Sequence, residues 1–215
     1  IGHLIAQSQN PTVGVLAHPS QVDVRIAAKA VSIEAAHDLI APVEEEVRRL
    51  LGRHIFATDD ETMEDSIGEL LASRNKTVSV YEDLTAGLLA GRLQTSNSEH
   101  FVEGVISNSE AAQQRLLQLS KNSSDTPDDA TNLTQKLASA VRNMSVSDLG
   151  LALHAVEHPD EEAENLARGR TYISITDGTS FKSRDYSYGG RGLPDRTRMS
   201  FNAIELLRIV LLDGF

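Results

Sequence analysis

The stretch from Thr77 to Gly91, which reads TVSVYEDLTAGLLAG, constrains the fold of this chain more than any other. Residues 77–81 are β-branched or aromatic apart from Ser79, as in a buried strand, and residues 84–93 are small and apolar at helical spacing. The pattern therefore predicts a strand, a tight turn and a helix. In an open α/β sheet, a ligand binds beyond the carboxyl end of such a strand, next to the free N–H groups of the helix. The polar residues predicted at this turn are Glu82, Asp83 and Thr85.

The rest of residues 57–215 alternates between strand and helix patterns, which is typical of an α/β domain. Residues 149–156, LGLALHAV, are almost continuously apolar, as expected for a strand that is covered on both faces. Asp177-Gly178 predicts a hairpin between two later strands. The other predicted strands are 101–107, 169–175 and 179–188, and the predicted helices are 109–119, 130–144 and the segment from Pro194 onward.

Residues 1–56 predict a smaller α+β module of two strands and a helix. The strand patterns cover 12–18 and 21–31, and apolar and polar residues alternate in the second of them. Ser32 is a good N-cap for the helix, which Gly52 ends. The segments predicted to join this module to the next helix are a short strand at 54–57 and a capping box at 58–61.

Composition excludes several classes of protein. The net charge of −11 argues against a nucleic-acid-binding face, because such a face draws its affinity from clustered Lys and Arg. The absence of cysteine excludes a disulfide framework and a thiolate metal site, and it fits the reducing cytoplasm. No apolar run approaches the roughly 20 residues of a membrane helix. We therefore expect a cytoplasmic protein without nucleic-acid or membrane partners and, since it begins at Ile1, a piece of a longer one.

The turn after the predicted central strand resembles a motif of the CinA family C-terminal domain, a nicotinamide-nucleotide amidase domain. The family motif runs Glu-Ser-Cys-Thr-Gly-Gly, and residues 82–87 of this chain read EDLTAG. The resemblance implies that Glu82, Thr85 and Gly87 contact the ligand. It also implies that Asp83 stands at the position of the nucleophilic serine.

Three further stretches resemble family motifs and place polar residues at the predicted site. GVISNSEAAQQRLLQL resembles Gly-Gly-Val-Val-x-Tyr-Ser-Asn-Glu-Ala-Lys, with Asn108 at the tyrosine and Gln113 at the lysine that serves as base. His154 replaces a threonine in the strand that the family ends with Ile-Thr-Gly-Ile-Ala-Gly-Pro. Asp195-Arg196 resembles the family's Gly-Asp-Arg helix entry, so that Arg196 is predicted to contact an anionic group or to form a salt bridge at the start of the helix.

The first 56 residues resemble the small KH-like module that precedes the amidase domain in CinA proteins. The resemblance rests on the ββα order, the Asn10-Pro11 turn and Arg25 in the second strand. The module has no Gly-x-x-Gly loop and no basic surface, so we expect no RNA binding. For residues 57–215 the resemblance implies a three-layer α/β/α domain built on a mixed sheet.

His154 and His158 form, with Glu157 and residues 160–162, the one group of residues with plausible metal-ligand types. A spacing of four serves zinc when both imidazole rings project from one face of a helix. Here the segment leaves a strand and enters a proline loop, so we expect a partly exposed pair of histidines, with no metal and no cofactor.

The sequence leaves three hypotheses open. In the first, Asp83 caps the helix and occupies its positive end, and a catalytically inactive domain binds a pyridine nucleotide or an ADP-ribose-like molecule. In the second, an amidohydrolase acts on nicotinamide mononucleotide or a related substrate, with Asp83 as base or nucleophile, His154 as proton carrier and Glu82 as orienting group. This hypothesis requires that the two side chains of Asp83 and His154 meet. In the third, the chain supports assembly as a homodimer or higher homo-oligomer.

Overall fold

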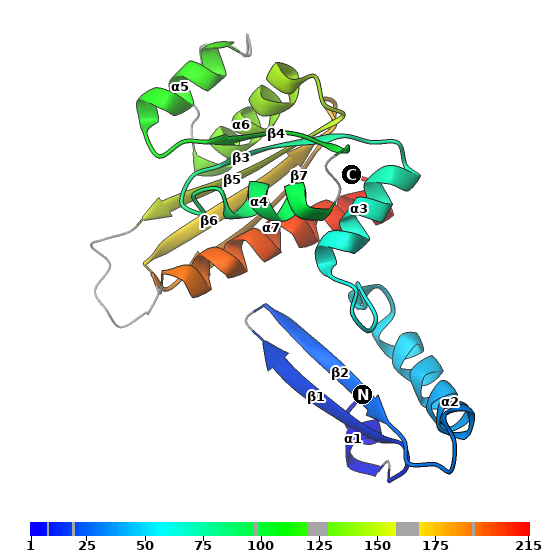
Figure 1. Ribbon diagram of the computed structural model, residues 1–215. Coiled ribbons are helices and arrows are strands. Elements are labelled where there is room, and N and C mark those ends of the chain that lie inside the picture. Colours follow the sequence, from blue (N-terminus) through cyan, green and yellow to red (C-terminus); the bar gives the residue numbers. More distant parts are fainter. Residues whose placement is uncertain (8, 19, 97–98, 120–128, 158–167, 191) are drawn as a thin grey trace. The chain divides into compact units, whose positions relative to one another are not determined.

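The computed structural model describes residues 1–215 except 8, 19, 97–98, 120–128, 158–167 and 191. The chain forms two compact units, Ile1–Thr62 and Met63–Phe215 (Figure 1). The boundary predicted at residue 56 falls within the first unit, in the segment that follows its long helix. Among the described residues, no helix is long and apolar enough to cross a membrane.

The first unit is an antiparallel hairpin with two helices. Ser32 caps the longer helix as predicted, because its hydroxyl accepts a hydrogen bond from the Ala35 N–H, and Gly52 ends this helix with a φ of 51°. The predicted strand at 54–57 is wrong: residues 52–54 form a 3₁₀ turn and no strand of the hairpin pairs with the residues that follow. The elements are α1 (Gly2–Gln7), β1 (Thr12–His18), β2 (Gln21–Ala27), α2 (Ile33–Leu51) and η1 (Gly52–His54).

The predicted capping box closes a turn ahead of the next helix. The Glu61 carboxylate accepts from the Thr58 N–H at 3.0 Å, and the Glu61 N–H donates to the Thr58 carbonyl at 3.1 Å. The helix, α3 (Met63–Ser73), begins only after this turn. The local hydrogen bonds of the motif therefore form, but they do not cap α3.

The second unit is built on a five-stranded mixed sheet, as the sequence predicts. The strand order is β4-β3-β5-β6-β7, with β3 parallel to both of its neighbours and β5, β6 and β7 antiparallel to one another. The strands are β3 (Val78–Glu82), β4 (Phe101–Ile106), β5 (Leu149–Glu157), β6 (Gly169–Thr176) and β7 (Phe181–Tyr188).

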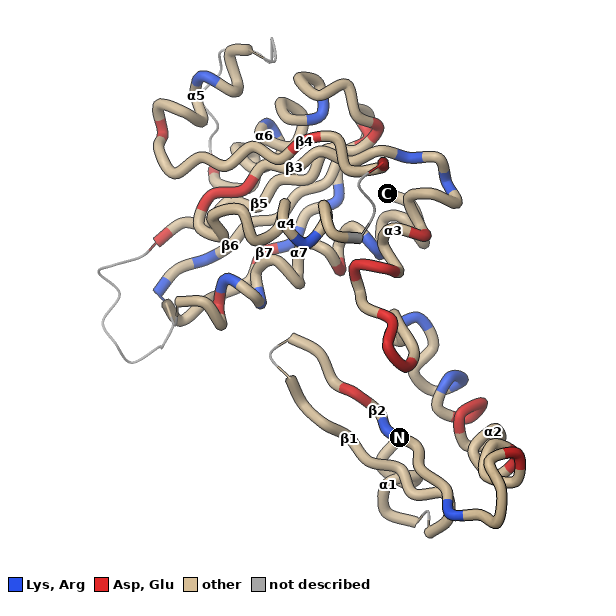
Figure 2. The backbone as a smooth tube through the Cα atoms, viewed as in Figure 1, with Lys and Arg blue, Asp and Glu red and all other residues tan. Residues whose placement is uncertain are grey.

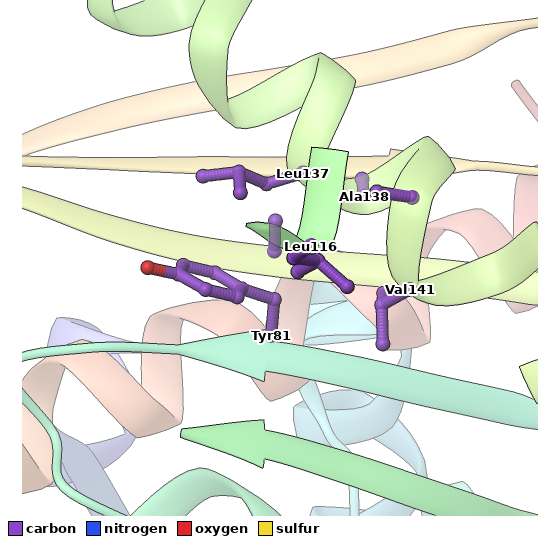
Figure 3. Close-up of a cluster of buried hydrophobic side chains, with 7 residues drawn as sticks. Tyr81, Leu116, Leu137, Ala138 and Val141 are labelled. Carbon is purple, nitrogen blue, oxygen red and sulfur yellow. The ribbon is translucent and has the colours of Figure 1, made fainter. Parts of the chain in front are cut away.

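Helices cover both faces of this sheet, which makes the three-layer arrangement (Figure 1). On one face α6 packs on the sheet and α5 packs on α6. In the core of this layer Tyr81 of β3 lies against side chains of both helices, among them Leu116, Leu137 and Val141 (Figure 3). On the other face α4 and α7 pack on the sheet and α3 packs on them. Besides α3, the helices of this unit are α4 (Leu88–Ser96), α5 (Glu110–Leu119), α6 (Ala130–Ser145) and α7 (Leu193–Asp213).

β3 is the centre of this unit and fixes the position of the site. All five of its residues are buried between two strands and two helical layers, which explains its almost unbroken apolar sequence. The N–H and hydroxyl of Thr77 both donate to Asp148 at 2.9 Å, so that β3 and β5 start together. Their register pairs Glu82 with Leu153, and it therefore places the next residues, Asp83 and His154, side by side.

The helix predicted at 84–93 begins later than expected, at Leu88. Ala86 and Gly87 have φ values of 55° and 95°, in the left-handed region that interrupts a helix. The Ala86 N–H donates to the Asp83 carbonyl at 2.9 Å, which closes a turn before the helix. Residues 83–87 are therefore a loop, and this changes the role of the two carboxylates that precede α4.

Candidate functional site

Glu82 is a buried cap of helix α4. Its side chain is fully buried, and its carboxylate accepts hydrogen bonds from the N–H groups of Leu89 at 3.1 Å and Ala90 at 2.8 Å. The hydroxyl of Thr85 donates to the same carboxylate. The prediction that Asp83 caps this helix is therefore wrong, because the later start of α4 brings Glu82 to its free N–H groups.

Asp83 instead forms a buried pair with His154. The Asp83 Oδ2 and His154 Nδ1 atoms lie 2.6 Å apart, and the two residues are 6% and 9% exposed. Asp83 Oδ1 also accepts from the N–H groups of Leu84 at 2.6 Å and Ala155 at 3.0 Å. The contact that the second hypothesis requires is present, although the two residues are 71 positions apart in the chain.

This pair lies at a cavity of about 240 Å³ at the carboxyl ends of β3 and β5. The volume is below the range of roughly 300–1,000 Å³ that is usual for small-molecule pockets, so the cavity fits a compact group better than a whole dinucleotide. Among the predicted site residues, those that line the cavity are Asp83, Asn108, Gln113, His154 and Arg196, and those that do not are Glu82, Thr85 and Gly87.

Two acidic residues also line the cavity: Glu110 at the start of α5, which the sequence analysis did not mark, and Glu157 at the end of β5, which it placed beside His154. Arg196, in the first turn of α7, also lines the cavity and carries the opposite charge to these two glutamates. No ion pair joins Arg196 to another residue of the described chain, so the salt bridge that the sequence allowed is not formed within it. The guanidinium therefore adds a positive charge to the lining of the cavity.

A second series of hydrogen bonds lies on the α5 side of the cavity. Gln113 Nε2 donates to the hydroxyl of Tyr81 at 3.0 Å, and this hydroxyl donates to the Ser107 carbonyl at 3.3 Å. Burial and the negative charge of Asp83 raise the pKa of Tyr81 to about 12. One signal in the sequence could have identified Tyr81: it precedes Asp83 by two residues, the spacing at which residues of a strand share a face.

The structure contains no group of three or more potential metal ligands within the residues that it describes. His158 and residues 160–162, which the sequence placed beside His154, lie outside the described residues. His154 itself is bound through Nδ1 to Asp83, which leaves Nε2 as the ring nitrogen for a ligand in the cavity.

The sequence matches two family models along almost its whole length. The Damage-inducible protein CinA KH domain matches residues 1–57, and the CinA C-terminal domain matches residues 60–211. The chain belongs to the CinA family. Its relatives include a CinA-like protein of Acaryochloris marina, which is 34% identical over 182 residues, or 82% of this chain and 43% of that protein.

Another relative, named as a competence-damage inducible protein of Clostridium novyi, is 32% identical over 215 residues, or 99% of this chain and 52% of that protein. This CinA-family chain thus spans about half the length of the relatives that it matches. Among solved structures, competence damage-inducible protein A of Klebsiella pneumoniae has a TM-score of 0.60 at 16% identity, covering 71% of this chain and 97% of that one. This similarity supports the fold alone.

Proposed function

We propose that the C-terminal domain of this CinA-family chain binds a pyridine nucleotide or an ADP-ribose-like molecule and does not hydrolyse an amide. The family resemblance attributes hydrolysis to a serine and a lysine, whose positions hold Asp83 and Gln113 here. The observation that carries the proposal is that the Asp83 carboxylate is held by three hydrogen bonds, from Leu84, His154 and Ala155.

These hydrogen bonds make Asp83 a poor substitute for the serine. A carboxylate whose oxygens accept three hydrogen bonds has few lone pairs left to attack a substrate or to take up a proton from water. Its charge also opposes the oxyanion that develops during amide hydrolysis. Gln113 has no group that takes up a proton at neutral pH, and its Nε2 already donates to Tyr81.

The remaining lining of the cavity favours a ligand with one anionic end. Arg196 supplies a permanent positive charge whose planar donors suit a phosphate group. Asn108 and Gln113 offer neutral hydrogen-bonding groups on the α5 side. The volume of about 240 Å³ accommodates one ring or one phosphate-bearing group of a nucleotide, with the rest of the ligand outside the cavity.

A second function is favoured by the geometry of the Asp83 and His154 pair. A buried carboxylate that holds Nδ1 of a histidine is the arrangement that orients an imidazole as general base, with Nε2 directed at a water molecule or substrate. In this case the His154 imidazole activates a water molecule and Asp83 orients the imidazole. No covalent intermediate forms. The domain would then be an amidohydrolase that acts on nicotinamide mononucleotide or a related substrate.

A thermal-shift titration of the full chain tests ligand binding, which both functions require. The ligands are nicotinamide mononucleotide, its acid form and ADP-ribose, and a ligand that binds only the folded state raises the melting temperature. The test variant is Arg196→Ala, and the matched control is Arg198→Ala, another exposed arginine of α7 that does not line the cavity. We expect a shift that Arg196→Ala abolishes and Arg198→Ala retains.

Ammonia release from nicotinamide mononucleotide is measured with the same proteins. No release above the control without protein is the expected result. Release that His154→Gln abolishes would instead establish the second function. The absence of a thermal shift with all three ligands, together with the absence of release, would contradict both functions and leave assembly as the role of the domain.

A further inference from the structure

Tyr188, the last residue of β7, has a hydroxyl group without a hydrogen-bonding partner among the described residues. The residue is buried, with 7% of its surface exposed. A buried hydroxyl that makes no hydrogen bond lowers the stability of a protein, and such groups are rare in native structures. The stability of the fold therefore does not explain why a tyrosine stands at this position.

The side chain of Tyr188 crosses the neighbouring strand in the direction of β5. The strand register pairs Tyr188 with Gly169 of β6, and it pairs Gly169 with Glu157 of β5. Residues that pair directly in antiparallel strands share a face of the sheet, so these three positions form one row. A Cβ atom on Gly169 would lie 2.5 Å from the Tyr188 hydroxyl oxygen. The hydroxyl therefore lies above β6, where the lack of a side chain at Gly169 makes room for it.

Glu157 is the next residue of this row, and it connects the row to the cavity. It is an exposed residue that ends β5 and lines the cavity. Neighbouring strands lie about 4.8 Å apart, a distance that the side chain of a glutamate can span. The Glu157 carboxylate can therefore reach the Tyr188 hydroxyl from the cavity side.

Acidic residues also set the protonation state of Tyr188. The end of β5 carries Glu157, and the first turn of α7 carries Asp195 (Figure 2). Burial, together with the negative charges of Glu157, Asp83 and Asp195, raises the pKa of the Tyr188 hydroxyl to about 12. Glu157 has the largest effect of the three carboxylates. The hydroxyl therefore keeps its proton at neutral pH and is a hydrogen-bond donor.

We propose that Tyr188 positions Glu157 to bind the sugar hydroxyls of a ligand in the cavity. The role rests on the proposed function, because the sugar is the ribose of a bound pyridine nucleotide. In the complex, one oxygen of the Glu157 carboxylate accepts a hydrogen bond from the Tyr188 hydroxyl, and the other accepts one from a ribose hydroxyl. Glu157 contacts the ligand, and Tyr188 is a positioning residue that acts through Glu157.

Ribose suits this carboxylate better than the other parts of a nucleotide. An ionised carboxylate only accepts hydrogen bonds, and its charge repels a phosphate group. The phosphate is better placed at Arg196, which lines the same cavity. Ribose hydroxyls are neutral donors, and in dinucleotide-binding folds an acidic side chain likewise binds a ribose hydroxyl. Ribose is also the part that nicotinamide mononucleotide, its acid form and ADP-ribose share.

Isothermal titration calorimetry of the full chain tests this contact with nicotinamide mononucleotide and its 2′-deoxy and 3′-deoxy forms. We expect the native chain to bind at least one deoxy form about tenfold more weakly, because a hydrogen bond to a charged group is lost. Glu157→Ala should bind all three ligands equally, and Tyr188→Phe should reduce the tenfold difference. The matched control is Tyr186→Phe, two residues earlier on the same face of β7, which should keep the difference.

Urea denaturation without ligand separates this positioning role from a structural one. Because the Tyr188 hydroxyl has no partner within the described chain, its removal should cost no stability. We therefore expect Tyr188→Phe to unfold at the same urea concentration as the native chain or at a higher one. Unfolding at a lower concentration would show that the hydroxyl supports the fold, and it would overturn the proposal.

The binding results distinguish a failure of this role from a failure of the proposed function. If the native chain binds nicotinamide mononucleotide and both deoxy forms equally, or if Tyr188→Phe keeps the full difference, the role of Tyr188 is refuted and the proposed function stands. If the native chain does not bind nicotinamide mononucleotide, the role of Tyr188 is also refuted. The proposed function is refuted with it only if the acid form and ADP-ribose do not bind either.

Discussion

Two neighbouring carboxylates leave β3 on opposite sides, and the surroundings of each decide its role. On the α4 side, Glu82 is fully enclosed and satisfies the N–H groups of a helix. On the other side, Asp83 meets His154 at the wall of a cavity. Two adjacent residues of the same charge class thus serve the framework and the site separately, because successive side chains of a strand point to opposite faces.

The two sides also differ in access to water. Two of the hydrogen-bonding partners of Glu82, Thr85 and Leu89, are shut off from water, because they are 2% and 0% exposed. The partners of Asp83 lie next to a cavity that water enters. Removal of each carboxylate should therefore affect stability unequally, and the following predictions test this inequality.

The largest effect is expected for Glu82→Ala. The substitution leaves two N–H groups of α4 and the Thr85 hydroxyl without an acceptor in a dry environment, so the free energy of unfolding should fall by about 3–4 kcal/mol. Urea denaturation measures this loss. The control is Glu110→Ala, an exposed carboxylate in the first turn of α5, with an expected loss below about 0.5 kcal/mol. Equal losses for both variants would show that Glu82 is not part of the framework.

Asp83→Ala should lower the free energy of unfolding by about 1–2 kcal/mol, less than Glu82→Ala, because water in the cavity can replace the lost hydrogen bonds. Urea denaturation under identical conditions gives the comparison. Ligand titration of the same variant should show a changed thermal shift, because Asp83 lines the cavity. A loss of stability as large as that of Glu82→Ala would remove the distinction between the two sides.

Thr85→Val should lower the free energy of unfolding by about 1 kcal/mol, because it removes one donor to the Glu82 carboxylate and keeps the shape of the side chain. Thr95→Val is a suitable control, since the Thr95 hydroxyl donates to the Gly91 carbonyl at an exposed position of α4. If both valine variants have the same stability, the hydroxyl of Thr85 does not contribute to the buried cap.

The smallest effect is expected for the part of the pKa shift of Tyr81 that the charge of Asp83 adds to burial. The unfolded-state pKa of tyrosine is about 10 and burial, with the charge of Asp83, raises that of Tyr81 to about 12. The unfolded chain therefore loses this proton first as the pH rises above 10, and stability should fall between pH 10 and 12. Asp83→Asn should lower the pKa of Tyr81 and reduce this fall, as measured by urea denaturation at pH 10, 11 and 12. An unchanged fall would show that the charge of Asp83 does not reach Tyr81.

Most of the secondary structure followed from local patterns. The N-cap at Ser32, the stop at Gly52 and the order of strands and helices in the second unit are confirmed, because these features depend on residues within one or two turns of each other. The strand predicted at 54–57 is wrong because a strand requires a partner, and its local sequence does not contain that information. The start of α4 was missed because Ala86, a good helix former, takes a left-handed conformation.

The sequence by itself determined the central position of β3, the residues available at its carboxyl end and the family to which the chain belongs. It also predicted five residues that line the cavity, from four separate segments. Only the tertiary structure decided that Glu82 caps α4 and that Asp83 pairs with His154. The reason is that periodicity is a local property, whereas the partner of a buried carboxylate is set by strand register and by the point at which the next helix begins.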